Sequence, residues 1–215
     1  TEDALINFKD AQIIDLSYTY IKNEGLKNFK NIREIYLKKT KVTDLSQLNC
    51  DKLRKIDLSY TLITDEGLKN LGKAPKLFNV NLNYCNMITD FGLENLERCK
   101  RIYLAGTNIT DNGLIHLKRC KKMICNNTSI KGFGFIHLKN IKEIGLFKTN
   151  ITNNSLKYLE NVNCLDIGYC QNITDEGFRY LTKISKIIIP GCNVTDETLK
   201  FFKNASTINI CNTLV

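Results

Sequence analysis

The chain of 215 residues contains no tryptophan, only 2 prolines and only 2 histidines. Its apolar residues occur in short runs, none near the ~18 that would suggest a membrane span. No Cys-x-x-Cys pair with the spacing of a zinc site is present, and neither histidine stands beside a cysteine as a nucleophile pair would. We therefore expect no catalytic residues, no metal or cofactor site and no membrane association.

Acidic residues are fewer than basic ones. Lys and Arg total 31 against 22 Asp and Glu, which leaves a formal charge of +9. Such an excess favours association with an acidic partner. Lys, Asn and Ile are abundant throughout, so the excess also fits a general bias in composition.

The chain contains a short sequence motif, here called a phrase, that is repeated along its whole length. An apolar, variable, apolar triplet is followed three residues later by Thr or Cys, as in "IDLSYT" and "VNLNYC". The second apolar residue recurs every 21 to 24 residues. The ten copies are at Leu16, Leu37, Leu58, Leu82, Leu104, Cys125, Leu146, Ile167, Ile189 and Ile210. A fixed period of this size indicates a solenoid. We expect ten short parallel strands on its concave face and short helices or turns on its convex face.

A second phrase, "ITDEGLKNL" from Ile63, follows most of the triplets. We expect Thr64 to cap a short helix, with Asp65 and Glu66 in its first turn. Gly67 is a poor helix former, so its position is predicted to face a neighbouring coil too closely for a Cβ. The second copy, "KVTDLSQLNC", lacks the Glu-Gly pair, so its helix should be displaced or reduced to a turn.

The 9 cysteines are predicted to be free thiols, and those at fixed positions of the repeat are predicted to be buried. Cys85, Cys170 and Cys192 occupy a position that other copies fill with Thr, and Cys125 replaces a strand Leu. Cysteine used as a small apolar residue favours a reducing compartment, so we expect an intracellular location. A disulfide framework is the less favoured alternative.

The combined pattern, Leu-x-x-Ile-x-Leu-x-x-Cys/Thr followed by Ile-Thr-Asp-x-Gly-Leu, resembles the cysteine-containing class of leucine-rich repeats found in F-box proteins. The resemblance covers the chain from end to end and implies a single α/β horseshoe over residues 1–215, cut within a repeat at both ends. It also implies a protein-interaction scaffold, as part of a ubiquitin-ligase adaptor or a pathogen effector. The repeats are shorter than usual in that class and closer to those of bacterial surface proteins, so an internalin-like adhesin is the alternative.

Strand alternation predicts which side chains point out of the concave face. Basic residues outnumber acidic ones there, and exposed Tyr and Arg are typical of binding hot spots. We therefore expect a monomer that binds a protein with an acidic surface. Nucleic acid is a less favoured partner, because no RNA or DNA module is recognisable. The predicted contact residues are Arg33, Tyr36, Lys38, Arg54, Lys55, Tyr60, Tyr84, Lys100, Arg101, Tyr103, Lys121, Lys122, Phe147, Lys148 and Tyr169.

Overall fold

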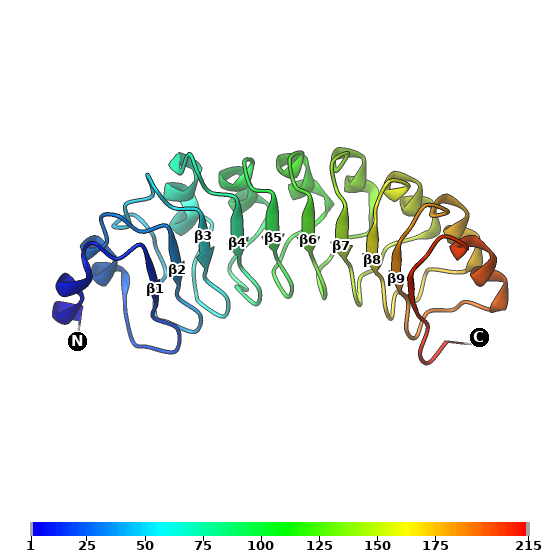
Figure 1. Cartoon of the computed structure of the whole chain (residues 1–215), viewed down its shortest axis with the longest axis horizontal. Helices are drawn as coiled ribbons and strands as arrows, with labels where there is room; N and C mark the ends of the chain where they lie inside the picture. Colours follow the sequence, from blue (N-terminus) through cyan, green and yellow to red (C-terminus); the bar gives the residue numbers. More distant parts are fainter. Residues whose placement is uncertain (1, 214–215) are drawn as a thin grey trace.

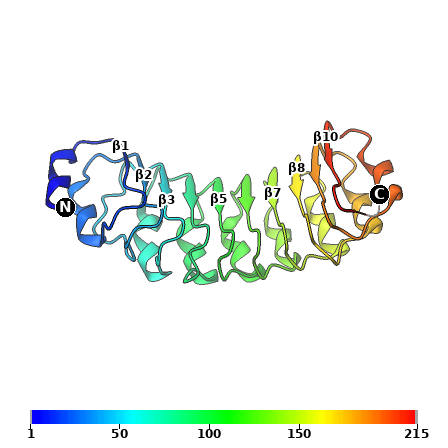
Figure 2. The same cartoon turned by 90° about the horizontal axis from the view of Figure 1, so that it is seen from below.

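The computed structural model describes residues 2–213 and shows a curved solenoid (Figure 1). One parallel sheet contains ten strands in the order of the chain, from β1 to β10. Short helices follow the outer edge of the arc, and the strands form the opposite layer (Figures 1 and 2). The predicted horseshoe is therefore confirmed. The strands are β1 (Ile13–Asp15), β2 (Glu34–Tyr36), β3 (Lys55–Asp57), β4 (Asn79–Asn81), β5 (Arg101–Tyr103), β6 (Lys122–Ile124), β7 (Glu143–Gly145), β8 (Cys164–Asp166), β9 (Lys186–Ile188) and β10 (Thr207–Asn209).

Each strand is only three residues long, and in β2 to β9 its middle residue is buried in the core. Ile35 of β2 pairs with Ile56 of β3, and both are fully buried. The Leu two positions later is buried as well, and its N–H continues the ladder, as from Leu37 to the carbonyl of Asp57 at 2.7 Å. The triplet in the sequence is thus a strand that sends alternate residues inward.

All nine helices of the described residues are 3-10 helices of five to eight residues. They are η1 (Glu2–Phe8), η2 (Asn23–Asn28), η3 (Glu66–Lys73), η4 (Asp90–Leu96), η5 (Asp111–Leu117), η6 (Phe133–His137), η7 (Asn153–Leu159), η8 (Asp175–Tyr180) and η9 (Asp196–Phe202). A 3-10 helix has three residues per turn, so Leu68 and Leu71 of η3 lie on one face, and both are buried. No helix forms between β2 and β3, where the Glu-Gly pair is missing, as predicted. None of the helices in residues 2–213 is long and apolar enough to cross a membrane.

The small residue of the helix phrase faces the preceding coil. A Cβ on Gly67 would lie 2.3 Å from the carbonyl oxygen of Thr43, and one on Gly134 would lie 2.4 Å from that of Asp111. Both distances are far shorter than a van der Waals contact, so backbone would have to move. The prediction that coil packing requires a small residue here is confirmed.

The aspartate of the Thr-Asp phrase has a larger role than the predicted place in a helix dipole. Asp65 accepts hydrogen bonds from the N–H and the hydroxyl of Thr89 in the next coil, at 2.9 and 2.6 Å. Asp111 is buried and accepts three backbone N–H groups of the following coil. Thr64 does cap its helix, since its Oγ1 accepts from the N–H of Gly67 at 3.1 Å. Asp65 and Asp111 therefore connect each of their coils to the following one.

The Thr or Cys after each strand also serves the fold. The hydroxyl of Thr61 donates to the carbonyl of Leu58 in its own coil at 2.7 Å. The thiol of Cys85 donates to the same carbonyl from the next coil, at 3.0 Å. All nine cysteines are free, and seven of them are buried. Burial raises the pKa of the Cys99 and Cys120 thiols to about 12, so these side chains remain neutral.

Candidate protein-interaction surface

The first predicted feature is a line of basic residues just before the strands, which we name the entrance row. Arg33 and Arg54 are exposed and joined laterally, because the N–H of Arg54 donates to the carbonyl of Arg33 at 2.8 Å. Lys100 and Lys121 are joined in the same way at 2.8 Å. Adjacent strands are ~4.8 Å apart, so each pair lies side by side on one line along the sheet. Phe78 interrupts it between Arg54 and Lys100. The entrance row consists of Arg33, Arg54, Phe78, Lys100, Lys121 and Lys142.

Within the strands, several predicted contact residues are engaged with one another. The Nζ of Lys55 donates to the hydroxyl of Tyr36 at 2.8 Å, and that hydroxyl donates to Glu34 at 2.8 Å. The first of these bonds raises the pKa of Lys55. Lys122 forms an ion pair with Glu143 at 2.6 Å, which compensates its charge. Lys55 and Lys122 should therefore attract an acidic partner less strongly than the basic residues of the entrance row do.

Arg101 is exposed, and Tyr103, two residues later in β5, is half-buried. Both residues point from the same face of the strand. Neither makes an ion pair within the described residues. They connect the entrance row to the middle of the sheet.

A second feature is a line of residues just after the strands, which we name the exit row. It occupies the position two residues after the second apolar residue of each triplet. In all ten coils the backbone at this position has positive φ. The exit row consists of Tyr18, Lys39, Tyr60, Tyr84, Gly106, Asn127, Lys148, Tyr169, Gly191 and Asn212. For residues other than glycine this conformation costs roughly 1–2 kcal/mol. Lateral hydrogen bonds hold it in place, as from the N–H of Tyr84 to the carbonyl of Ala105 at 2.6 Å.

Aromatic and basic side chains of the exit row gather over the first four coils. The rings of Tyr60 and Tyr84 are stacked, with centroids 4.6 Å apart. The ammonium groups of Lys38 and Lys39 each lie 5.4 to 5.6 Å from the rings of both Tyr18 and Tyr60. A hydrogen bond from Lys38 lowers the pKa of the Tyr18 phenol. This cluster is preorganised by its own contacts.

A smaller cluster lies further along the sheet. Phe147 and Tyr169 meet edge to face with centroids 5.3 Å apart, and Lys148 lies 5.5 Å from the Phe147 ring. The ring of Tyr169 extends over Gly191, where a Cβ would lie only 2.7 Å from it. Glycine at that position therefore makes room for the neighbouring ring.

The structure places many of the predicted residues in two separate lines, the entrance row and the exit row. Others lie in the strands between the two lines, namely Tyr36, Lys55, Arg101, Tyr103 and Lys122. Arg54 and Tyr60 are six residues apart along one extended segment, a span of up to ~20 Å. The exposed Tyr60 thus has Lys38 and Lys39, and the exposed Tyr169 has Lys148, as cationic neighbours rather than the entrance row.

Six of the ten exit-row members were not among the predicted contact residues, and Tyr18 and Lys39 are the two of these that join the aromatic and basic cluster. The segment LSYT occurs at Leu16 and again at Leu58. Tyr18 therefore occupies the same position in its repeat as Tyr60 and could have been predicted as a contact residue on that basis.

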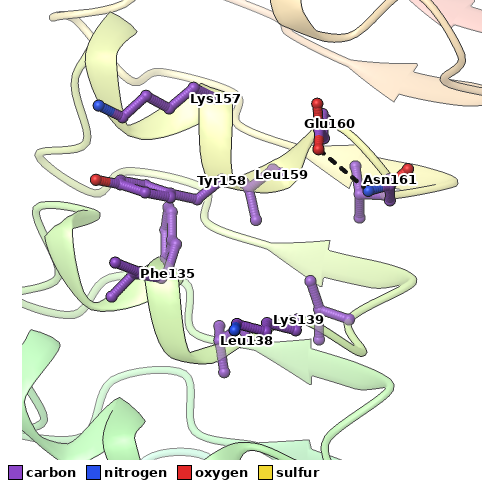
Figure 3. Close-up of a pocket in the computed structure, with 11 residues that line it drawn as sticks. Phe135, Leu138, Lys139, Lys157, Tyr158, Leu159, Glu160 and Asn161 are labelled. Atoms are coloured by element: carbon purple, nitrogen blue, oxygen red, sulfur yellow. Dashed lines mark hydrogen bonds between the residues drawn. The ribbon is translucent and has the colours of Figure 1, made fainter.

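The convex side carries a pocket of about 360 Å³ between η6 and η7 (Figure 3). η6 is only five residues long and begins after Gly132, whose φ is +99°. Phe135 and Tyr158 lie close together on its wall, while the amine of Lys157 points away (Figure 3). Within residues 2–213 no group of His, Cys, Asp or Glu side chains could hold a metal ion.

Comparisons with known proteins agree with this geometry. A family profile described as "Leucine Rich repeat" matches residues 49–72 and 158–181. Among solved structures, an internalin, inlF, from Listeria monocytogenes is similar with a TM-score of 0.73 at 16% identity, covering 94% of this chain and 67% of that chain. The chain has the leucine-rich-repeat fold. A comparison with curated protein sequences gave no match.

Two further leucine-rich-repeat structures cover nearly all of the chain. Internalin C2 from Listeria monocytogenes has a TM-score of 0.65 at 16% identity, over 100% of this chain and 82% of that one. Toll in the Toll–Spatzle complex from Drosophila has a TM-score of 0.69 at 14% identity, over 96% of this chain. The chain spans only 33% of that structure's length. At this level of identity the likeness is one of fold.

Proposed function

We propose that the chain is a protein-interaction scaffold that binds a partner with an acidic surface on the strand face of the solenoid. The observation that carries the proposal is the entrance row. Arg33 and Arg54 are neighbours, Lys100 and Lys121 are neighbours, and all four are exposed and without an ion pair in residues 2–213. Uncompensated charge of one sign on one face accelerates the encounter with a partner of the opposite sign.

The same fold is found in complexes with macromolecules. One similar structure is the Toll–Spatzle complex, and another is a complex of TLR13 with a single-stranded RNA, with a TM-score of 0.65 at 16% identity over 94% of this chain and 34% of that one. The first supports a protein partner. The second is the reason to include nucleic acid as a control.

We also propose that the chain acts as a monomer and without catalytic activity of its own. The acids that the repeated phrase brings together have structural tasks. Asp65 links two coils, and Glu66 forms an exposed ion pair with Lys69 at 2.7 Å.

A capture experiment tests the scaffold proposal. The wild-type chain and the variant Lys100→Glu/Arg101→Glu/Lys121→Glu serve as parallel baits in an extract of the source cells. Circular dichroism confirms that the variant is folded, as expected because all three side chains are exposed. We expect a protein that the wild type retains and the variant loses. If every retained protein binds both baits equally, the strand face is not the interaction surface.

The more specific roles stay predictions. An F-box-type adaptor or an effector acting in the cytoplasm requires a reducing compartment, and the seven buried free thiols support that location. The full-length sequence tests these roles, because an adaptor needs a helical segment outside the repeats. A signal peptide or cell-wall anchor would favour the internalin-like adhesin instead.

A further inference from the structure

Large apolar side chains are exposed along the exit edge of the first four coils. Tyr18, Tyr20 and Tyr60 are 63%, 84% and 44% exposed, and Leu62 and Met87 are 60% and 52% exposed. Tyr84 adds a further ring stacked on Tyr60. We name this group the exit edge: Tyr18, Tyr20, Lys38, Lys39, Tyr60, Leu62, Tyr84 and Met87.

The fold does not require apolar residues there. Later coils place polar, exposed residues in the loop position that Tyr20 and Leu62 occupy in the first and third coils. These are Asn108, Ser129, Asn150 and Asn193. Exposed apolar side chains gathered on one part of an otherwise polar edge mark an interaction site.

Two unpaired cations lie in the middle of the exit edge. Neither Lys38 nor Lys39 forms an ion pair in the described part of the chain. The nearby carboxylate of Asp57 is already occupied, because it accepts from the N–H and hydroxyl of Ser59 and from Asn81. Asp15 likewise accepts from the N–H of Ser17 at 2.8 Å. Lys38 also donates to the Tyr18 phenol, but neither ammonium group has a carboxylate partner at ion-pair distance, so both can contact an external anion.

We propose that the exit edge of the first four coils is a docking site for a protein segment that carries carboxylates beside an apolar side chain. The carboxylates would lie against Lys38 and Lys39, and the apolar side chain against Leu62 and Met87 on the adjacent coils. This inference rests on the proposed scaffold function and locates its anchor at the edge of the sheet rather than at the centre of the strand face.

The state of the aromatic rings favours a polypeptide over single-stranded nucleic acid. Binding of nucleic-acid bases uses free aromatic faces for stacking. Here Tyr60 and Tyr84 stack on each other, and ammonium groups lie over Tyr18 and Tyr60. Tyr18, Tyr60 and Tyr84 therefore offer mainly their edges and hydroxyl groups, which suit the side chains and amides of a peptide, and only Tyr20, at 84% exposed, lacks such a neighbour among these rings.

Selection from random dodecapeptides displayed on phage tests the proposal. The most enriched peptide is synthesised with a fluorescent label, and its Kd is measured by anisotropy. We expect enrichment of sequences with Asp or Glu next to Leu, Ile or Phe. Two variants alter the exit edge, Lys38→Glu/Lys39→Glu and Leu62→Ser/Met87→Ser. Lys118→Glu/Arg119→Glu, which reverses two exposed charges just after η5, is the matched control. Lys100→Glu/Arg101→Glu is a separate variant that tests the strand face.

Each exit-edge variant should raise Kd by about tenfold or more, while the control should change it by less than about threefold. Loss of binding in the strand-face variant alone would overturn the docking site and leave the scaffold function standing. Enrichment without an acidic preference, or tighter binding of a labelled dT12 than of the peptide, would also overturn it. Binding that no variant affects would contradict both proposals.

Discussion

Asp90 and Thr110 are 20 residues apart in the chain, yet two hydrogen bonds join them. The N–H of Thr110 donates to one carboxylate oxygen at 2.7 Å, and its hydroxyl donates to the other at 2.6 Å. The same link joins Asp65 to Thr89 and Asp175 to Thr195. At these three places the Asp of one coil thus accepts both hydrogen bonds from the Thr of the next coil.

Removing one such link should destabilise the solenoid. We expect Asp90→Ala to lower the free energy of unfolding by about 1–3 kcal/mol, because the N–H and hydroxyl of Thr110 lose their acceptor. Urea unfolding followed by circular dichroism measures the change. Glu66→Ala is the control, since this exposed acid makes only a surface ion pair and should cost less than about 0.5 kcal/mol. Equal effects of the two substitutions would contradict the coil-linking role of Asp90.

Coil packing predicts a difference between two glycines of one helix. Gly67→Ala would place a Cβ 2.3 Å from the Thr43 carbonyl, whereas at Gly72 the nearest atom is the side-chain oxygen of Asn95, at 3.1 Å. Overpacking against backbone costs roughly 1–3 kcal/mol. Thermal or urea unfolding should show that loss for Gly67→Ala and little change for Gly72→Ala. If Gly67→Ala is neutral, the packing of the second and third coils differs from the one described.

The period of the repeat predicted the fold, because a buried strand residue such as Ile56 must recur once per coil. The helix phrase likewise predicted that Gly67 faces a neighbour. Which hydrogen bonds Asp65 makes could not be predicted, since the choice between its own helix and the next coil depends on the spacing between coils. The division of the contact residues into entrance and exit rows was also missed. Alternation identifies outward residues but does not show that the backbone turns to positive φ at Tyr60.

Thiol reactivity tests the burial of the cysteines. At pH 8 in native buffer, Cys211 should react quickly with a thiol reagent because it is exposed. Cys164 should react more slowly, because partial burial raises its pKa. The other seven are buried, and burial raises the pKa of Cys50 to about 12 and of Cys192 to about 11. They should react only after unfolding. Fewer than nine reactive thiols in urea without reductant would indicate a disulfide.

Acid should weaken the link between Asp175 and Thr195. Burial opposes ionisation of Asp175, but hydrogen bonds from Thr198 and Thr195 outweigh it and lower its pKa below the ordinary value of 3.8. A carboxylate with a depressed pKa stabilises the fold above the unfolded value and loses that contribution as pH falls through the folded value. The stability difference between wild type and Asp175→Asn should therefore be present at pH 7 and shrink below about pH 3.8.

Asp196→Asn is the control for that series, because Asp196 is the exposed residue next to Thr195 and its substitution removes the same charge. A stability difference for Asp175→Asn that stays constant from pH 7 to pH 2 would show that ionisation of Asp175 does not support the link.

The most direct test of the scaffold function is the association rate of a captured partner as a function of ionic strength. Surface plasmon resonance compares the wild-type chain with Lys100→Glu/Arg101→Glu/Lys121→Glu and with Tyr84→Ala. If the entrance row steers an acidic partner, the wild-type rate should fall as salt rises, since the screening length shortens to ~8 Å at physiological ionic strength. The charge-reversal variant should associate more slowly at low salt, whereas Tyr84→Ala should mainly raise the dissociation rate. Rates that are independent of salt and equal in all three proteins would contradict binding on the strand face.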